Sequence, residues 1–221
     1  TDVVVRAERF ETIKPFRPTL RILSFDIETS LKEPKIFTIC CVVKDGDKVE
    51  SRGFEGDEAK MIRDFTEYII EADPDVITGY NIDGFDIPQI LQRAQALRGP
   101  ELAWGRYPGT ISQYNNRFWW CEGRVIVDAW WAVKKVLKPK QETLNAVSKL
   151  LLGEEKHDVD PKKMDEEWAT DKARVMRYCT QDAHLALRVL EKIAIMNRNM
   201  DLAAVSKLPL DDVVNGTTSQ L

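Results

Sequence analysis

The sequence Phe-Asp-Ile-Glu-Thr at residues 25–29 places two acids at the end of an apolar stretch. Apolar and polar side chains alternate before it, which predicts a β-strand over residues 20–27. Residues i and i+2 of a strand point to the same side, so Asp26 and Glu28 share a face near the carboxyl end of this strand. Two acids that close repel each other unless a cation lies between them. The pair therefore indicates either a metal site or a strand end with two solvated acids.

A further acid lies in the third string in chain order, Tyr-Cys-Thr-Gln-Asp at residues 178–182, inside a helix that the periodicity predicts over about 171–200. Residues i and i+4 of a helix lie one above the other, so Tyr178 and Asp182 share a face. Apolar residues near that face place it against the sheet, where an aspartate is costly unless it is paired or bound to metal. The alternative is a Tyr–Asp pair at a solvated helix edge.

The second string in chain order is Tyr-Asn-Ile-Asp-Gly-Phe-Asp at residues 80–86, between a predicted strand at 75–79 and a predicted helix at 87–97. Asp86 is placed either to cap that helix or to act as a ligand. Asn81 and Phe85 suit a loop that holds a nucleotide, because the amide can hydrogen-bond and the ring offers a stacking face. Together the three strings offer four carboxylates and a phenol, a set that can hold two hard divalent cations beside a phosphodiester.

The remaining elements are expected from the same periodicities and from turn residues. We expect strands at residues 36–44, 48–53 and 124–127, helices at 57–72, 130–137 and 142–151, a loop or projecting hairpin at 102–123, and a charged loop at 153–164. Residues 1–19 are expected to be a lead-in. Because strands come first and helices then interleave, the pattern predicts an α/β domain with a mixed sheet.

The composition suits one domain rather than two, with 221 residues of which 43% are hydrophobic. A net charge of -4 excludes a strongly basic nucleic-acid coat, but not a nucleic-acid enzyme, whose metal-binding acids add negative charge. The four cysteines form no C-x-x-C pair and indicate buried thiols in a reducing compartment. We see no signal peptide and no apolar run near the about 18 residues of a membrane span, so we expect an intracellular protein, cytoplasmic or nuclear or nucleoid-associated, without a membrane partner.

Together the three strings resemble the exonuclease motifs of family B DNA polymerases, which belong to the DEDD exonucleases with a tyrosine in the third motif. The matching patterns are F-D-I-E-T, Y-N-x-x-x-F-D and Y-x-x-x-D. The resemblance covers about residues 20–200 and implies a ribonuclease H-like fold, a mixed sheet flanked by helices. Residues 201–221 look like the stretch that leads toward a polymerase module, and no palm motif is present.

The resemblance implies a role for each acid. Asp26, Glu28 and Asp182 match the acids that bind one divalent metal ion, Mg²⁺ or Mn²⁺, while Asp26 and Asp86 match those that reach a second. Tyr178 matches the residue that orients the attacking water. The implied activity is metal-dependent 3′→5′ removal of nucleoside 5′-monophosphates from single-stranded or frayed DNA ends, as in proofreading.

The resemblance also implies contacts with the substrate. Thr29, Asn81 and Phe85 match positions that contact the single-stranded 3′ end. Lys156 resembles a lysine that helps to stabilise transition-state charge, although short lysine-rich loops are usually only solvated. The implied partner is a DNA polymerase module in the same or another chain. Two rival functions stay open: trimming of RNA 3′ ends, and a catalytically silent module that braces a polymerase.

Three further features allow both a functional and a structural interpretation. Asp128 follows the strand at 124–127 and is interpreted as structural. The aromatic clusters at 118–120 and 130–131 could stack bases, but core or hairpin packing explains them as well. A basic cluster either tracks a phosphate backbone or is a solvated face, and comprises Lys134, Lys135, Lys138 and Lys140.

Overall fold

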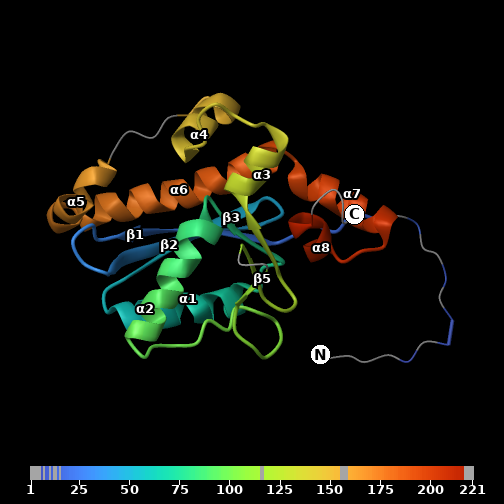
Figure 1. The fold of residues 1–221 in the computed structure, drawn as a ribbon, viewed down its shortest axis with the longest axis horizontal. Coiled ribbons are helices and arrows are strands. Elements are labelled where there is room, and N and C mark those ends of the chain that lie inside the picture. Colours follow the sequence, from blue (N-terminus) through green and yellow to red (C-terminus); the bar gives the residue numbers. More distant parts are fainter. Residues whose placement is uncertain are drawn as a thin grey trace.

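A five-stranded mixed sheet forms the centre of the protein in the computed structural model, which describes residues 16–114, 117–154 and 159–216 together with residues 6, 8, 9, 11 and 14 (Figure 1). The strand order is β3-β2-β1-β4-β7. The strands are β1 (Ile22–Thr29), β2 (Ile36–Asp45), β3 (Lys48–Glu55), β4 (Val76–Gly79) and β7 (Val125–Asp128). β1, β4 and β7 run parallel, and β2 is antiparallel to both β1 and β3. This confirms the predicted α/β class with a mixed sheet.

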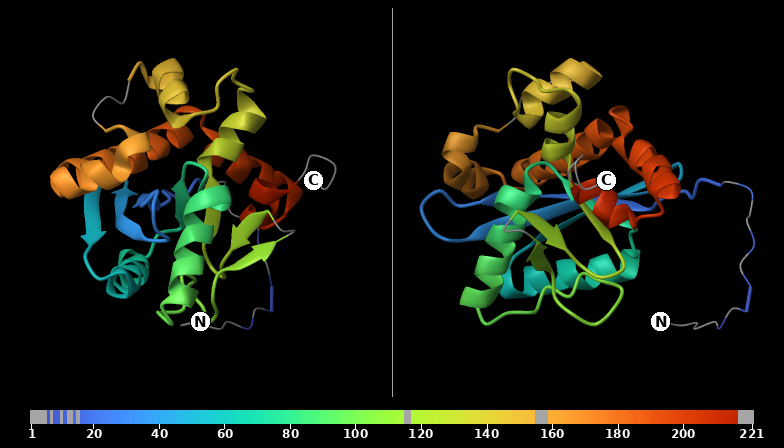
Figure 2. Two further views of the ribbon diagram at one scale, coloured as in Figure 1. Left: turned by 60° about the vertical axis from the view of Figure 1, so that its left-hand side comes forward. Right: turned by 45° about the vertical axis from the view of Figure 1, so that its right-hand side comes forward.

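Helices cover both faces of the sheet (Figures 1 and 2). The long α6 crosses one face with α3 and α4 beside it, and α1 and α2 lie on the other. The helices are α1 (Glu58–Ala72), α2 (Ile87–Ala96), α3 (Ala129–Val136), α4 (Leu144–Leu152), α5 (Met164–Thr170), α6 (Lys172–Lys192), α7 (Ile195–Ser206) and α8 (Leu210–Asn215). Two shorter helical turns are η1 (Ile82–Asp86) and η2 (Pro161–Lys163). No helix of the described segments is at once long and apolar enough to cross a membrane.

The two faces of β1 have different neighbours. Phe25 points toward α1, where its ring lies 5.3 Å from Phe65 and 5.7 Å from Trp104, centroid to centroid. Ile22 belongs to the cluster on the opposite side, with α6 residues such as Leu187. Since side chains alternate along a strand, Asp26 and Glu28 lie on the α6 side with Ile22.

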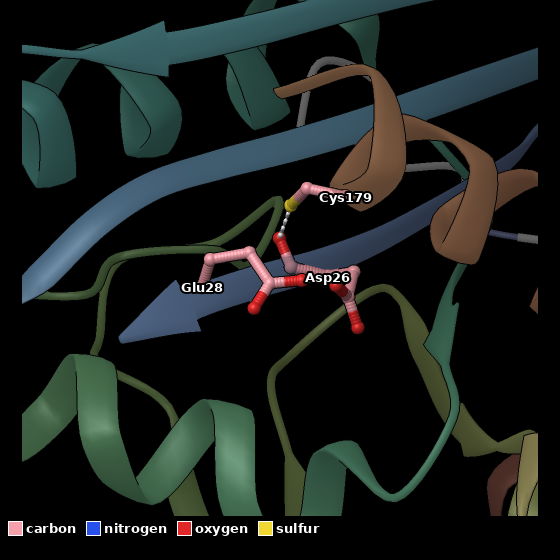
Figure 3. Close-up of side chains that lie close together, drawn as sticks. All are labelled: Asp26, Glu28 and Cys179. Atoms are coloured by element: carbon pink, nitrogen blue, oxygen red, sulfur yellow. Dashed lines mark hydrogen bonds between the residues drawn. The ribbon is translucent and has the colours of Figure 1, made fainter. Parts of the chain in front are cut away.

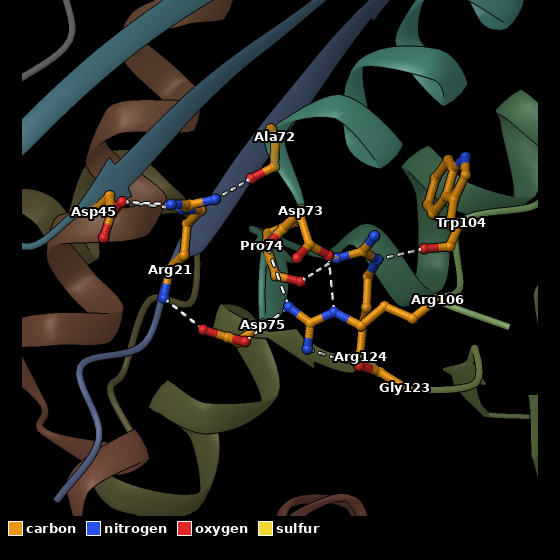
Figure 4. Close-up of polar contacts among 10 residues, drawn as sticks. All are labelled: Arg21, Asp45, Ala72, Asp73, Pro74, Asp75, Trp104, Arg106, Gly123 and Arg124. Carbon is orange, nitrogen blue, oxygen red and sulfur yellow. Dashed lines mark hydrogen bonds and ion pairs between the residues drawn. The ribbon is translucent and has the colours of Figure 1, made fainter. Parts of the chain in front are cut away.

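A polar network fixes the amino ends of the three parallel strands (Figure 4). Asp73, which precedes β4, accepts hydrogen bonds from Arg124 at 2.6 Å and from Arg106 at 2.8 Å. Asp75 accepts from the backbone N–H of Arg21 at 2.8 Å, just before β1. Arg124 is only 3% exposed and directly precedes β7. The starts of β1, β4 and β7 are therefore tied together, and their carboxyl ends lie at the opposite edge, where ligands bind in open α/β sheets.

The predicted elements are mostly present, with shifted ends. β1 begins and ends two residues later than the predicted strand, so Asp26 and Glu28 lie within it. Residues 102–123 do contain a hairpin, β5 (Ser112–Tyr114) and β6 (Phe118–Trp120). Asp57 caps α1, as expected, by accepting from the N–H of Lys60 at 2.9 Å.

The prediction of one helix over 171–200 is wrong. The helix is interrupted at Ala194, whose φ of 53° is left-handed, and α7 starts in a new direction. This turn lets Ile195 and Met196 pack into the cluster beside α6 instead of continuing along its axis. The charged segment 153–164 is also only partly a loop, because η2 and α5 begin within it.

Candidate active site

The two acids of β1 lie in the carboxyl half of the strand, Asp26 three residues and Glu28 one residue before its last residue. Asp26 pairs with Cys40 of β2 and Glu28 with Thr38, and the register shifts between Glu28 and Thr29. One carboxylate oxygen of Asp26, one of Glu28 and the Sγ of Cys179 all lie within 4.8 Å of one another (Figure 3). Both acids are partly buried in a central strand, so they are not the fully solvated pair of the alternative interpretation.

Helix α6 brings the third string onto β1. The Sγ of Cys179 donates a hydrogen bond of 3.2 Å to the backbone carbonyl of Asp26, which fixes the helix against the strand (Figure 3). Tyr178 and Asp182 occupy consecutive turns and are 8% and 6% exposed. This burial excludes a solvated pair at the helix edge. Burial, and then the charges of Glu28 and Asp26, raise the pKa of Tyr178, so its phenol stays protonated at neutral pH.

The second string leaves β4 through a left-handed residue, Asn81, with φ 66°. Asp128, at the end of β7, accepts from the backbone N–H groups of Asn81 at 2.8 Å and Asp83 at 3.1 Å. It also caps α3 by accepting from the N–H of Trp130 at 2.8 Å. Asp128 thus shapes the backbone of this loop, in agreement with its predicted structural role.

Asp86 lies at the end of η1 and is 3% exposed. It does not cap α2 with its side chain. Instead its carboxylate accepts a hydrogen bond of 3.2 Å from the N–H of Ile27, between the two acids of β1. Burial, then the charges of Asp26 and Asp128, raise the pKa of Asp86 well above its usual value. A nearby cation would remove this cost of ionising a buried acid.

Gly79 is a contributor that the sequence interpretation missed. A Cβ on this residue would collide with the carbonyl oxygen of Phe25 and with Cγ2 of Ile82. Only glycine therefore lets β4 end this close to β1, immediately before Asp26. A glycine at a strand end is a signal of close backbone approach, although it does not identify the partner.

The remaining predicted contact residues lie around these acids. Thr29 is the last residue of β1 and is partly exposed, and Asn81 is exposed. Phe85 is 41% exposed although it directly precedes the buried Asp86, so its ring is open to solvent. Lys156 lies outside the described residues.

The aromatic and basic clusters have mixed surroundings. Trp119 is buried and donates to the carbonyl of Asp83 at 3.1 Å, as expected for packing. Trp130 and Trp131 meet edge to face, with centroids 4.5 Å apart. Of the basic cluster, Lys134 pairs with Glu142 at 3.1 Å and Lys135 donates to a backbone carbonyl of α8.

The donor set suits hard divalent cations. Asp26, Glu28, Asp86 and Asp182 offer only carboxylate oxygens, which Mg²⁺ and Mn²⁺ prefer. Cys179 offers a sulfur, but burial raises its thiol pKa well above the usual value, and its Sγ already donates to Asp26. A protonated thiol is a poor ligand, so the residues present fit an oxygen-ligated metal.

Residues 44–147 match DNA polymerase family B, exonuclease domain. A solved structure of the family B DNA polymerase from the hyperthermophilic archaeon Pyrobaculum calidifontis aligns with 93% of this chain, with a TM-score of 0.76 and 29% identity. The chain belongs to the family B DNA polymerase exonuclease domains. Its mixed sheet and helices are consistent with the ribonuclease H-like exonuclease fold.

This exonuclease domain is also similar to DNA polymerase delta catalytic subunits. It is 31% identical over 240 residues to that of Mesocricetus auratus and 30% identical over 218 residues to that of Drosophila melanogaster. These alignments cover 86% and 89% of this chain but only 21% and 20% of the relatives, so the chain spans about a fifth of their length. It covers 28% of the archaeal polymerase chain. The match at 44–147 contains the second string but not the first or third.

Proposed function

We propose that this family B exonuclease domain is a metal-dependent 3′→5′ exonuclease that removes nucleoside 5′-monophosphates from single-stranded or frayed DNA ends. The observation that carries the proposal is the hydrogen bond from Ile27 to Asp86, which places a buried acid from η1 between the two acids of β1. The α6 acid, Asp182, is buried in the helix that packs on the same strand.

The acids divide into two ligand sets. Asp26, Glu28 and Asp182 would hold one divalent cation, and Asp26 and Asp86 would reach a second, with Mg²⁺ or Mn²⁺ as the metal. Two such cations lower the pKa of an attacking water and stabilise the oxygen that leaves. The four carboxylates would determine where that chemistry takes place, because they extend from β1 and from the two elements that pack against it, η1 and α6.

Tyr178 would orient the attacking water rather than remove its proton. Its raised pKa keeps the phenol protonated, and a protonated phenol can donate to or accept from a water but is no base. Asn81, Phe85 and Thr29 would hold the terminal nucleotide, with the exposed ring of Phe85 as the stacking surface. Lys156 would add positive charge near the phosphate.

The wider setting is also part of the proposal. We assign residues 20–200 to the exonuclease, residues 1–19 to a lead-in, and residues 201–221 to a connection toward a polymerase module. The boundary at residue 200 falls inside α7. A DNA polymerase partner and a nuclear location agree with the delta subunits among the relatives.

The test is degradation of a 5′-labelled DNA strand by the chain with Mg²⁺ and with chelator. We expect a ladder shortened from the 3′ end, release of nucleoside 5′-monophosphates, and no reaction with chelator. Asp26→Ala should nearly abolish release while the circular dichroism spectrum stays normal, since this acid belongs to both ligand sets. Faster degradation of a matched RNA would instead indicate an RNA-trimming enzyme, and no degradation of either would indicate a silent module.

A further inference from the structure

A cavity of about 490 Å³ lies on the side of η1 that faces α7 and α8. Figure 2 shows α8 next to the hairpin β5–β6, and these elements enclose the cavity together with α3 and β7. Its volume is in the range of small-molecule sites. The interior walls are largely apolar and include Phe118, Trp131, Ile195, Leu202 and Val213.

One acid of the cavity lining, Asp83, has a buried carboxylate oxygen without a hydrogen-bond partner among the described residues. Asp83 is 7% exposed, and among the described residues its Oδ1 has no hydrogen-bond partner. The neighbouring acid in the lining, Asp128, already accepts from three backbone N–H groups, as described above. An orphaned buried polar atom is costly, and a ligand or water that reached it from the cavity would complete its hydrogen bonding.

The protonation state of Asp83 gives the expected direction of that hydrogen bond. Burial, and then the charge of Asp128, raise its pKa to about 8, against a lowering by Arg117 and by the backbone of Trp119. At neutral pH the carboxyl group is therefore mostly protonated and presents an O–H donor. The matching ligand atom is a buried hydrogen-bond acceptor.

The remainder of the polar lining is basic. Arg117, Lys135, Lys138 and Arg198 line the cavity, and the acids in its lining, among the described residues, are Asp83 and Asp128. None of the four basic side chains is in an ion pair with a described residue. The guanidinium of Arg117 is held 3.5 Å from the ring centroid of Trp131. A ligand that fits has an anionic group for the basic side chains, a flat apolar body for the walls, and an acceptor for Asp83.

We propose that this cavity binds a nucleoside 5′-monophosphate, with the phosphate at the basic side chains and the base against the apolar walls. The choice of a mononucleotide rests on the proposed function, because the proposed reaction releases that molecule next to Asp86, on the same turn η1. Every base carries a ring or carbonyl acceptor, so one donor from Asp83 gives little discrimination among bases.

The test is calorimetric titration of the chain with dAMP and with dTMP, in chelator and in an Asp26→Ala background. Under these conditions neither cleavage nor metal binding at the acids contributes, so the result is independent of the proposed reaction. We expect saturable binding of both nucleotides with one site per chain. Inorganic phosphate and unphosphorylated deoxyadenosine should each bind more weakly, because each lacks one half of the ligand.

The variants identify the site. Lys138→Glu combined with Arg198→Glu should weaken the binding of dAMP at least about tenfold, because two attractive charges become repulsive. Lys140→Glu combined with Lys207→Glu, outside the cavity lining, is the matched control and should change little. Asp83→Leu should weaken binding, whereas Asp83→Asn, which keeps a donor, should retain it.

Four results would overturn the proposal. These are the absence of saturable binding, equal weakening by the two charge-reversal pairs, phosphate alone binding as tightly as dAMP, and Asp83→Leu binding as tightly as the parent. Asp83→Leu is interpreted only if its circular dichroism spectrum is unchanged. If that spectrum does change, the two charge-reversal pairs still test whether the cavity binds the nucleotide.

Discussion

Asp86 of η1 accepts a hydrogen bond of 3.2 Å from the backbone N–H of Ile27 of β1. Ile27 lies between Asp26 and Glu28, so this bond sets the position of the η1 acid relative to both β1 acids. It also places the carboxylate where Asp26 raises its pKa. The hydrogen bond itself lowers the pKa of Asp86, but burial and the charge of Asp26 outweigh it, so the ionised acid is destabilised in the metal-free protein.

Asp86→Asn should increase the stability of the metal-free protein and reduce its response to metal. The amide oxygen can still accept from Ile27, but the side chain no longer repels Asp26. We expect the melting temperature in chelator to rise and the further rise with Mg²⁺ to be smaller than in the wild type. Thermal melts with chelator and with Mg²⁺ measure both effects. An equal Mg²⁺ response in the two proteins would show that Asp86 does not contribute to metal binding.

Tyr178→Phe should lower turnover and leave DNA affinity unchanged. The ring and its packing remain, and only the hydroxyl that would orient water is lost. We expect roughly a tenfold to hundredfold fall in kcat, about 1.4–2.7 kcal/mol of transition-state stabilisation. Single-turnover rates at saturating DNA, with a separate binding titration in Ca²⁺ or chelator, distinguish the two quantities. Weaker DNA binding with an unchanged saturated rate would make Tyr178 a binding residue instead.

Phe85→Ala should weaken capture of the 3′ nucleotide. The ring is 41% exposed beside the buried Asp86, and stacking of a base on an aromatic ring contributes about 1–3 kcal/mol. The loss should be similar for all four bases and larger for single strands than for paired ends. Leu97→Ala, a similarly exposed apolar residue after α2, is the control. A base-specific loss, or the same effect from both variants, would exclude stacking on Phe85.

Gly79→Ala should lower both stability and exonuclease activity. The added Cβ would collide with the backbone of Phe25, and such overpacking costs about 1–3 kcal/mol. Gly53→Ala is the matched strand control, because its closest neighbour is Cε of Met176, the end of a flexible side chain. Urea denaturation should give a larger loss for Gly79→Ala. Equal losses would mean that β4 can move away from β1 at little cost.

The raised pKa of Asp83 predicts a pH effect on stability. Its pKa is about 8 in the folded protein against the ordinary 3.8, so between these values the native state binds more protons than the unfolded state. The free energy of unfolding therefore falls as pH rises through this window, by up to about 6 kcal/mol from this group. In urea denaturation, the free energy of unfolding of Asp83→Asn should fall less between about pH 5 and about pH 9 than that of the wild type. If the two proteins lost stability equally with pH, the pKa of Asp83 would not be raised in the folded protein.

Local patterns predicted the elements that carry the acids. The alternation around Phe25 and the helical spacing of Tyr178 and Asp182 both reflect burial on one face, so they are visible in the sequence. They predicted that Asp26 and Glu28 share a side of one strand and that Tyr178 and Asp182 share a face of one helix. The structure agrees on both points.

The parts that the sequence did not predict depend on tertiary contacts. The Ile27–Asp86 bond joins residues 59 positions apart, and local reasoning therefore left Asp86 open as a helix cap. The break at Ala194 has no local signal, because alanine favours helix and only the packing of the following residues reverses the direction. Likewise, the surroundings of Asp83 depend on Asp128 and Trp119, which contact its backbone from 45 and 36 positions later in the chain.

The network around Asp73 has a consequence for the effect of ionic strength. Arg124 is 3% exposed and donates to the carbonyls of Trp104 and Pro74, and dissolved salt screens these buried contacts only weakly, although the carboxylate of Asp73 is half exposed. The exposed pair of Arg21 with Asp45 is screened more, but it is only one part of the attachment. The parallel strands thus stay aligned in concentrated salt. Since phosphate contacts weaken steeply under the same conditions, inhibition by salt would measure the release of DNA rather than the loss of the folded site.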